Sequence, residues 1–281
     1  MQPSVGIHKG IPASDYHHWS ALSNSHLNHL RKSPAHLQAY LAEPSKDTPA
    51  FKLGRAIHCA ILEPDIFPTK YFLGLDVDRR TKEGKTAWVD YLKTHDESCV
   101  LSPADYARCA AIRDAVWKKK TARVLLKAVG EAELSIAWDR NGVLCKARYD
   151  WISQDLDGGT IVDLKSTTDA SPKQFEKSIF NFGYHRQGAF YLDGAAPCHI
   201  PVENYVVLAV EKDTPYESAA YKIKTEVLQA GWLQVEPLIE KYKACCERGE
   251  WPGYADMFTD IGIPAWGWSE LSNEGIIGGE F

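Results

Sequence analysis

The hydrophobic residues in the first half of the chain recur with the period of amphipathic helices. Pairs such as Ser33-Pro34, in which a capping serine precedes a proline, mark where such helices begin. The predicted helices cover residues 23–31, 34–41, 50–62 and 103–120. Residues 65–100 lack a clear period and are predicted to be rich in loops, with a basic, glycine-containing loop at 78–85. We therefore expect a helical N-terminal portion over about residues 1–128.

After residue 130 the pattern changes to the alternation of strands. Three strands are predicted at residues 132–138, 143–151 and 160–165, and Asn141-Gly142 is a strong hairpin signal between the first two. The elements predicted next, in the order helix, helix, strand, strand and helix, cover residues 171–180, 184–194, 202–210, 218–224 and 225–247. This order indicates an α/β fold with a core over about residues 129–250 and an irregular C-terminal segment, 251–281.

Composition places the chain among ordinary globular proteins. Its 281 residues are 44% hydrophobic and 25% charged, so one large domain can bury a substantial core. No apolar run approaches the ~20 residues of a membrane helix, and the first ten residues lack the apolar core of a signal peptide. We expect a cytoplasmic protein with no membrane partner. The seven cysteines are scattered and include no C-x-x-C pair, which disfavours a disulfide framework and a zinc ribbon.

The formal net charge of −5 counts mildly against a nucleic-acid-binding protein, because such proteins are often basic. Acidic metal ligands would contribute to this charge, and local basic patches could still contact phosphates.

Acidic residues on two neighbouring predicted strands carry the first chemical signal. On strand 143–151, Asp150 shares a face with Lys146 and Arg148, since a strand alternates its faces. If the next strand forms an antiparallel pair with it, Asp163 can lie opposite Asp150. Two opposed carboxylates repel unless a cation lies between them, and carboxylates are ligands that suit Mg²⁺ or Mn²⁺. The alternative is an exposed, solvated sheet face.

Lys165 lies two residues after Asp163 and so on the same face. Its ammonium could orient an attacking water or stabilise charge on a phosphate, while a metal polarises the phosphoryl group. Two carboxylates and a lysine on adjacent strands therefore fit metal-assisted hydrolysis of a phosphodiester.

This set of residues resembles the PD-(D/E)XK nuclease superfamily: Asp150 is followed after 12 residues by Asp163-Leu164-Lys165. Upstream, the segment from Gly54 to His58 is similar to the glycine–histidine helix motif of the RecB-like branch. Downstream, the segment from Gln187 to Tyr191 is similar to its Q-x-x-x-Y motif. The segments beginning at Leu22, Ser33 and Ile263 further resemble the RecE-type (exonuclease VIII) group of phage and prophage exonucleases. One departure is Tyr149, which stands where the superfamily name has proline.

The resemblance implies one nuclease domain over residues 1–281, with a restriction-endonuclease-like core in which helices flank a central mixed β-sheet. It implies that His58, Asp150, Asp163 and the backbone carbonyl of Leu164 hold one or two Mg²⁺ ions, for which Mn²⁺ can substitute. It also implies 5′-to-3′ digestion of linear double-stranded DNA from its ends, leaving 3′ overhangs for recombination. A ring-shaped homo-oligomer and a single-strand annealing protein as partner belong to the same expectation.

Further candidates come from position near this site. Glu133 can complete the acidic set, with a solvated strand edge as the alternative, and Gln187 and Tyr191 can flank the site from one helix face. Gly54 and Ala56 would let the helix of His58 approach the sheet closely. Candidate DNA contacts are Arg79, Arg80, Lys82, Lys85, Lys119, Ser166 and Thr167.

Two other functions remain open from the sequence. The same fold could serve a structure-specific endonuclease or a helicase-associated nuclease module. A non-catalytic DNA-binding protein could also keep the fold, although such a protein has no need to retain Asp150, Asp163 and Lys165 together.

Overall fold

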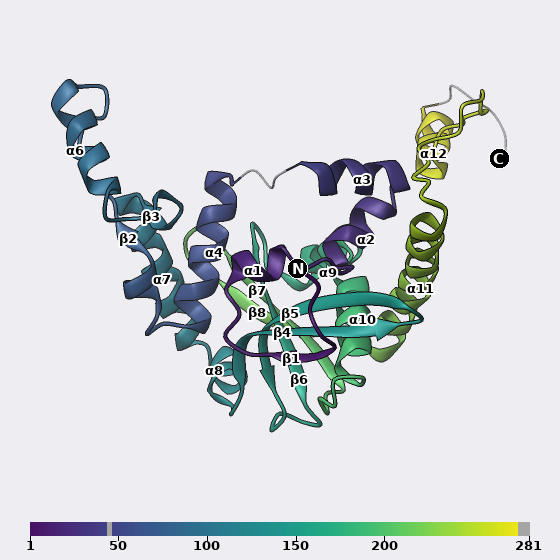
Figure 1. The fold of residues 1–281 in the computed structure, drawn as a ribbon, viewed down its shortest axis with the longest axis horizontal. Helices are drawn as coiled ribbons and strands as arrows, with labels where there is room; N and C mark the ends of the chain where they lie inside the picture. Colours follow the sequence, from purple (N-terminus) through teal and green to yellow (C-terminus); the bar gives the residue numbers. More distant parts are fainter. Residues whose placement is uncertain (44–46, 275–281) are drawn as a thin grey trace.

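A six-stranded mixed β-sheet forms the centre of the computed structural model, which describes residues 1–43 and 47–274 (Figure 1). The strand order is β1-β4-β5-β6-β7-β8, with bounds Gly6–His8, Glu131–Arg140, Val143–Ser153, Thr160–Thr167, Asn204–Glu211 and Ser218–Lys222. Strands β6 and β7 are parallel, and the other neighbouring pairs are antiparallel. The predicted α/β fold with a central mixed sheet is therefore confirmed.

The hairpin between β4 and β5 sets the position of the acidic residues. Asn141 and Gly142 both have positive φ, 54° and 83°, as the predicted two-residue turn requires. Because the turn fixes the register, Arg140 pairs with Val143 and the pairing continues to Ala132 opposite Trp151. Side chains of the two strands are thereby aligned along the whole hairpin.

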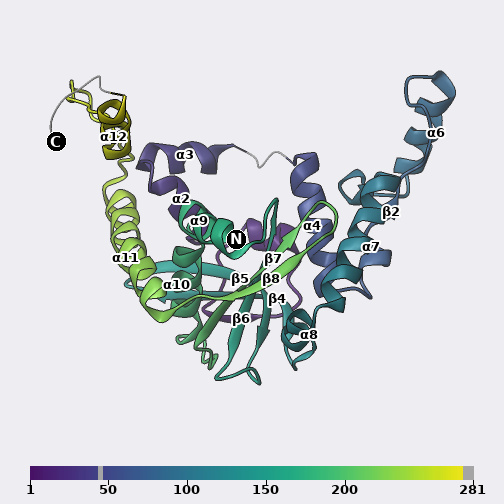
Figure 2. The same ribbon diagram turned by 180° about the vertical axis from the view of Figure 1, so that it is seen from behind.

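Helices cover both faces of the sheet (Figures 1 and 2). On one face, a core that includes Trp138, Tyr149 and Phe190 packs under α2 (Asn24–Leu30), α3 (Pro34–Ala42), α9 (Pro172–Phe182), α10 (Tyr184–Ala195) and α11 (Thr225–Arg248). On the other face, a second core that includes Ile57 and Leu164 packs under α4 (Pro49–Leu62), α7 (Pro103–Lys118) and α8 (Lys120–Lys127). The sheet is thus the middle of three layers.

Gly188 is needed where α10 crosses the sheet. A Cβ built there would come within 2.5 Å of the Tyr205 ring on β7, so a larger residue would push the helix away. Gly54 has no such role, because a Cβ built there meets nothing within 4 Å. The expectation that Gly54 allows a close approach of α4 was wrong, whereas Ala56 is fully buried.

The helical N-terminal portion also contains strands that the sequence pattern did not indicate. Strand β1 joins the main sheet beside β4, and α1 (Ala13–His17) follows it. Strands β2 (Phe72–Leu73) and β3 (Val100–Leu101) form a small parallel pair, with α5 (Phe67–Lys70) and the short 3-10 helix Glu97–Cys99 nearby in sequence. Three or fewer residues are too short for a periodic signal.

Three predictions of secondary structure were wrong in part. Residues Lys82–Leu92 form helix α6, capped by Thr81, whose side chain accepts a hydrogen bond from the Gly84 amide, so the second half of the predicted basic loop is helical. The predicted 103–120 helix is interrupted at Lys119, which separates α7 from α8. In the C-terminal segment, Ala265–Asn273 form α12, while residues 275–281 lie outside the described part of the chain.

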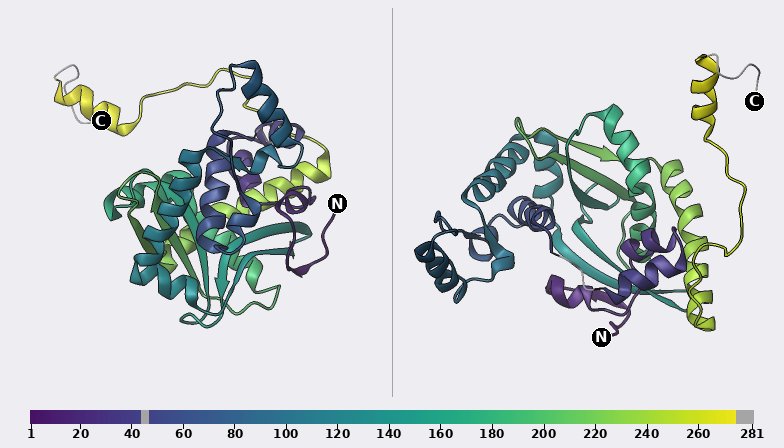
Figure 3. Two further views of the ribbon diagram at one scale, coloured as in Figure 1. Left: turned by 90° about the vertical axis from the view of Figure 1, so that its left-hand side faces the viewer. Right: turned by 90° about the horizontal axis from the view of Figure 1, so that it is seen from above.

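Two arms extend from the three layers, one ending in α6 and the other in α12 (Figures 1 and 3). Within the described residues, none of the helices combines the length and apolarity that crossing a membrane requires.

Candidate active site

The β5–β6 pairing brings Asp150 and Asp163 together. Trp151 pairs with Val162 and Ile152 with Ile161, and the regular ladder ends there, one residue before Asp150 and Asp163. Asp150 Oδ2 accepts a hydrogen bond from the Leu164 amide at 2.7 Å, which ties the two strands together where the regular ladder ends. Asp150 thereby comes within reach of helix α4, whereas Asp163 faces helix α10 on the other side of the sheet, where Gln187 contacts it.

Glu133 flanks Asp150 from the other neighbouring strand. The β4–β5 register, with Leu134 opposite Tyr149, puts Glu133 opposite Asp150. Glu133 has a φ of 55°, a left-handed conformation that is uncommon for glutamate and is found where surrounding structure imposes it. Its carboxylate forms an ion pair with Arg148, whose guanidinium also donates to the Ile11 carbonyl at 2.7 Å.

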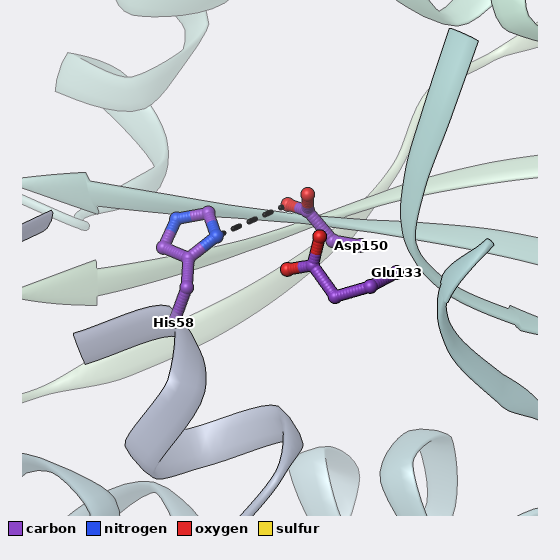
Figure 4. Close-up of side chains that lie close together, drawn as sticks. All are labelled: His58, Glu133 and Asp150. Atoms are coloured by element: carbon purple, nitrogen blue, oxygen red, sulfur yellow. Dashed lines mark ion pairs between the residues drawn. The ribbon is translucent and has the colours of Figure 1, made fainter. Parts of the chain in front are cut away.

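His58 comes to this cluster from helix α4, and its Nδ1 lies 3.6 Å from Asp150 Oδ2 (Figure 4). The backbone of Leu164 also lies close to its ring. One ligand atom each from His58, Glu133 and Asp150 lie within 4.8 Å of one another. Oxygen ligands surround Mg²⁺ or Ca²⁺ at about 2.0–2.6 Å, so ligands of one ion are up to about 5 Å apart. The donor set and its spacing therefore fit one hard divalent cation with an imidazole ligand.

Asp163 is held by two other partners. Its Oδ1 accepts a hydrogen bond from Gln187 Nε2 at 2.7 Å, and its Oδ2 lies 2.6 Å from Lys165 Nζ. The side chain is almost fully buried. The sequence reasoning placed Asp163 among the metal ligands. Among the described residues, the three-ligand cluster contains Glu133 instead, and Asp163 lies beside this cluster.

Electrostatics reflect the crowding of charge in a poorly solvated site. Burial and the Asp163 carboxylate raise the pKa of Asp150 well above its usual range. Burial lowers the pKa of His58, and the positive charge of Lys165 lowers it further, which keeps the imidazole neutral and able to bind a metal. For Lys165, burial acts to lower the pKa, but the Asp163 and Asp150 carboxylates outweigh it and raise the pKa, so the ammonium stays charged.

Gln187 and Tyr191 both lie on the buried face of α10, as their spacing predicted. Gln187 holds Asp163, whereas the Tyr191 backbone carbonyl accepts a hydrogen bond from the Tyr149 hydroxyl at 2.8 Å. Tyr149 therefore fastens α10 to β5 from the position where the superfamily name has proline.

The structure places the candidate DNA contacts in two different regions. Arg79 stacks over Trp88 at 4.5 Å and Arg80 pairs with Asp78 at 3.0 Å. Lys82 and Lys85 lie at the start of α6, on an arm away from the central sheet (Figure 1). Lys119 pairs with Glu217. Ser166 and Thr167 follow Lys165 on β6, and Thr167 Oγ1 donates to the Asp169 carbonyl at 3.2 Å. Only Ser166 and Thr167 are adjacent to the acidic site.

Two residues that the sequence reasoning did not assign complete the surroundings. Arg148 neutralises Glu133, and its place two residues before Asp150 on the same strand face was the available signal. Tyr184 presents its ring to Lys165, whose Nζ lies 5.2 Å from the ring centroid. Nothing in the sequence distinguishes Tyr184 from the other twelve tyrosines.

Most of the chain resembles one solved structure at low sequence identity. A crystal structure of a protein described as a "putative exonuclease" from Eubacterium rectale matches with a TM-score of 0.57 and 15% identity, covering 93% of this chain and 99% of that chain. A second, the crystal structure of SSO0001, has a TM-score of 0.28 and 13% identity over 73% of this chain and 81% of that chain. No curated protein matches the chain. The first match supports the fold alone.

A family model covers most of the chain and the entire acidic site. Residues 23–259 match the family described as a PDDEXK-like domain of unknown function. The chain therefore belongs to this family and has a nuclease-like domain of the PD-(D/E)XK superfamily.

Proposed function

We propose that this protein is a divalent-metal-dependent exodeoxyribonuclease that digests linear double-stranded DNA. The observation that carries the proposal is the cluster of His58, Glu133 and Asp150 beside the ion pair of Asp163 and Lys165. Metal ligands and a charged lysine on adjacent strands are what hydrolysis of a phosphodiester needs. The structural neighbour described as a putative exonuclease supports the choice of exonuclease.

His58, Glu133, Asp150 and the Leu164 carbonyl would hold the metal, with Asp163 as a further carboxylate. When bound, Mg²⁺ or Mn²⁺ supplies a water of lowered pKa and polarises the phosphoryl oxygen. The Lys165 ammonium, held beside Asp163 Oδ2, can donate a hydrogen bond to the attacking water or to a phosphate oxygen. Since Lys165 stays protonated, it contributes positive charge rather than acting as a base.

Gln187 and Arg148 support the residues that touch the reacting groups. Gln187 fixes one oxygen of Asp163 and leaves the other directed at Lys165. Arg148 compensates Glu133, so that three neighbouring carboxylates can remain together in the folded protein. Such supporting contacts typically change affinity for a metal, or activity, by about 10–100-fold.

The decisive assay measures nucleotide release from linear duplex DNA labelled at either 5′ end. Early loss of the 5′ label with Mg²⁺, absent with EDTA and absent in Asp163→Ala, is the expected result for a 5′-to-3′ enzyme. Release that persists in a folded Asp163→Ala variant would overturn the assignment of the site. If the wild type releases no nucleotide under any metal condition, the remaining function is that of a non-catalytic DNA-binding protein.

An endonuclease of the same fold is the second candidate, because the acidic site alone does not select for DNA ends. A covalently closed circle separates the two functions. The exonuclease leaves the circle intact and digests it only after linearisation, whereas the endonuclease cuts it.

The wider role follows from the resemblance to RecE-type enzymes and is part of the proposal. A cytoplasmic enzyme of this kind would form a ring-shaped oligomer, and would pass its 3′ overhangs to a single-strand annealing protein. Light scattering gives the oligomeric mass, and co-purification with an annealing protein encoded nearby tests the partner.

A further inference from the structure

A basic pocket lies at the start of α10, where α2, α9 and α11 meet it. It has a volume of about 590 Å³ and is bordered by the end of α2, the end of α9, the start of α10 and the middle of α11. Its charged lining residues are Arg31, Arg186 and Lys241, and none of its lining residues is acidic. The pocket is thus large enough for a nucleotide and carries only positive charge.

Arg186 is buried without an anionic partner. Only 5% of the residue is exposed, and its guanidinium donates to two neutral amide oxygens, Gln234 Oε1 at 3.1 Å and Asn28 Oδ1 at 3.3 Å. Burial lowers its pKa, and Arg31 lowers it further, with no carboxylate acting against them. A buried cation is normally paired with an anion, because leaving water is unfavourable for an isolated charge.

The guanidinium lies at the junction of two helices. A Cβ built on Gly183 would lie 2.0 Å from an Arg186 terminal nitrogen, so the guanidinium packs directly on the residue that ends α9 and precedes α10. The partial negative charge of the α9 C-terminus and the partial positive charge of the α10 N-terminus oppose each other there. The helix ends therefore do not replace the anionic partner that Arg186 lacks, and an anion bound in the pocket would supply it.

Acidic residues of α11 face away from the pocket. Glu236 pairs with Arg140, and Glu240 accepts a hydrogen bond from Asn141, both at the β4–β5 hairpin. Neither Arg31 nor Lys241 has an ion pair within the described residues, and both are exposed. The positive charges of the pocket are therefore available to a ligand.

Apolar surface lies beside the charges. Phe180 is 70% exposed and stacks on the His185 ring at 6.0 Å, and Leu233 is 72% exposed. Both line the pocket. An exposed aromatic ring beside phosphate-binding cations is an arrangement that can receive a base and its phosphate.

We propose that this pocket binds a phosphate of the DNA strand, with the adjoining base against Phe180, at a site separate from the carboxylate cluster. Arg186 and Gln187 are consecutive but reach in different directions, one into the pocket and the other to Asp163. Helix α10 therefore connects the anchoring site to the site of hydrolysis. The identification of the anion as DNA rests on the proposed function. The observation that Arg186 lacks an anionic partner does not depend on it.

The test is DNA binding without hydrolysis, using a fluorescein-labelled linear duplex in EDTA and fluorescence anisotropy over a range of salt. The double variant Arg31→Gln/Lys241→Gln changes only exposed side chains, so its fold should be preserved. We expect its Kd to rise about tenfold at low salt and the slope of log K against log salt to fall by about two. The control Lys127→Gln/Arg248→Gln removes the same charge from exposed positions outside the pocket and should retain the wild-type slope.

Arg186→Met provides a second, independent readout. An unpaired buried charge contributes no stability, so its Tm should equal or exceed that of the wild type while DNA affinity falls. A lower Tm with unchanged affinity would show a structural role and overturn the proposal.

Unchanged affinity in the double variant would also overturn it, even if the wild type is an active nuclease that depends on Asp163. In that case, a labelled acidic peptide that binds the wild type but not the double variant would identify a carboxylate ligand instead. Conversely, a pocket-dependent affinity in a protein without nuclease activity would support the anchoring site and reject only the proposed function.

Discussion

Gln187 Nε2 donates a hydrogen bond to Asp163 Oδ1 at 2.7 Å, linking helix α10 to strand β6 of the acidic site. Both side chains are buried, so this contact decides how the carboxylate is oriented. The other oxygen of Asp163 is left to Lys165. The Q-x-x-x-Y motif thus acts on the site through Asp163.

We expect Gln187→Met to lower kcat about 10–100-fold, because Asp163 loses the donor that orients it. Gln187→Glu should lower it at least as much, since a second carboxylate would repel Asp163. The measurement is the single-turnover rate of nucleotide release. Gln174→Met, at an exposed position of α9, is the control and should match the wild type. Equal rates for Gln187→Met and the wild type would reject an orienting role for Gln187.

Asp150→Asn should raise the free energy of unfolding of the metal-free protein by about 1 kcal/mol while abolishing activity. Asp150 lies between Glu133 and Asp163, and removing one of three neighbouring negative charges relieves repulsion. Asparagine keeps an oxygen that can accept the Leu164 amide. The measurement is thermal unfolding in EDTA and in excess Mg²⁺.

The wild type should gain stability on adding Mg²⁺, because a ligand that binds only the folded state stabilises it. Asp150→Asn should lose most of that gain, whereas the exposed Asp155→Asn should keep it. A full Mg²⁺ response in Asp150→Asn would place the metal elsewhere.

Lys165→Met should lower kcat by at least about 100-fold, because the positive charge beside the reacting phosphate is lost. It should also destabilise the metal-free protein by roughly 1–3 kcal/mol, since Asp163 is left buried and uncompensated. In the double variant Asp163→Asn/Lys165→Met the stability should largely return while activity stays absent. If the losses in free energy of unfolding of the two single variants simply add in the double variant, then the two residues do not interact.

The central part of the site could be predicted from the sequence because it depends on local rules. A strand alternates its faces, so Asp163 and Lys165 were placed on one face from spacing alone, and their side chains form an ion pair. Asp150 departs from this rule, because Tyr149 and Ile152 pack into the same core and the alternation of β5 is broken between them. The Asn141-Gly142 turn set the β4–β5 register in the same way. These features need no knowledge of distant contacts.

The remaining features arise from tertiary contacts. The ion pair of Glu133 with Arg148 depends on a left-handed backbone at Glu133, which local preference disfavours. Arg186 becomes a buried charge only in the folded protein, where α2, α9 and α11 surround it. Helix α6 was missed because residues 82–92 are mostly exposed and show little apolar period.

Lys146 supplies a prediction about stability and pH. It lies on β5, is 2% exposed, and donates to the carbonyls of Tyr16 and Trp19, both at 2.9 Å, which fastens α1 and the turn after it to the sheet. Burial lowers its pKa from 10.5 to about 8. Between these two values the unfolded chain binds more protons than the folded protein, so this lysine makes stability rise with pH.

The free energy of unfolding of the wild type, relative to Lys146→Met, should therefore increase by up to about 3 kcal/mol between about pH 7.5 and pH 10.5. Urea unfolding in EDTA at several pH values gives this difference directly. Lys173→Met, at an exposed position of α9, should show no such change with pH. The difference in free energy of unfolding between the wild type and Lys146→Met could instead stay constant over this pH range. That result would show that the carbonyls at the end of α1 keep the Lys146 ammonium charged, so that its contact with the helix end is charge-assisted.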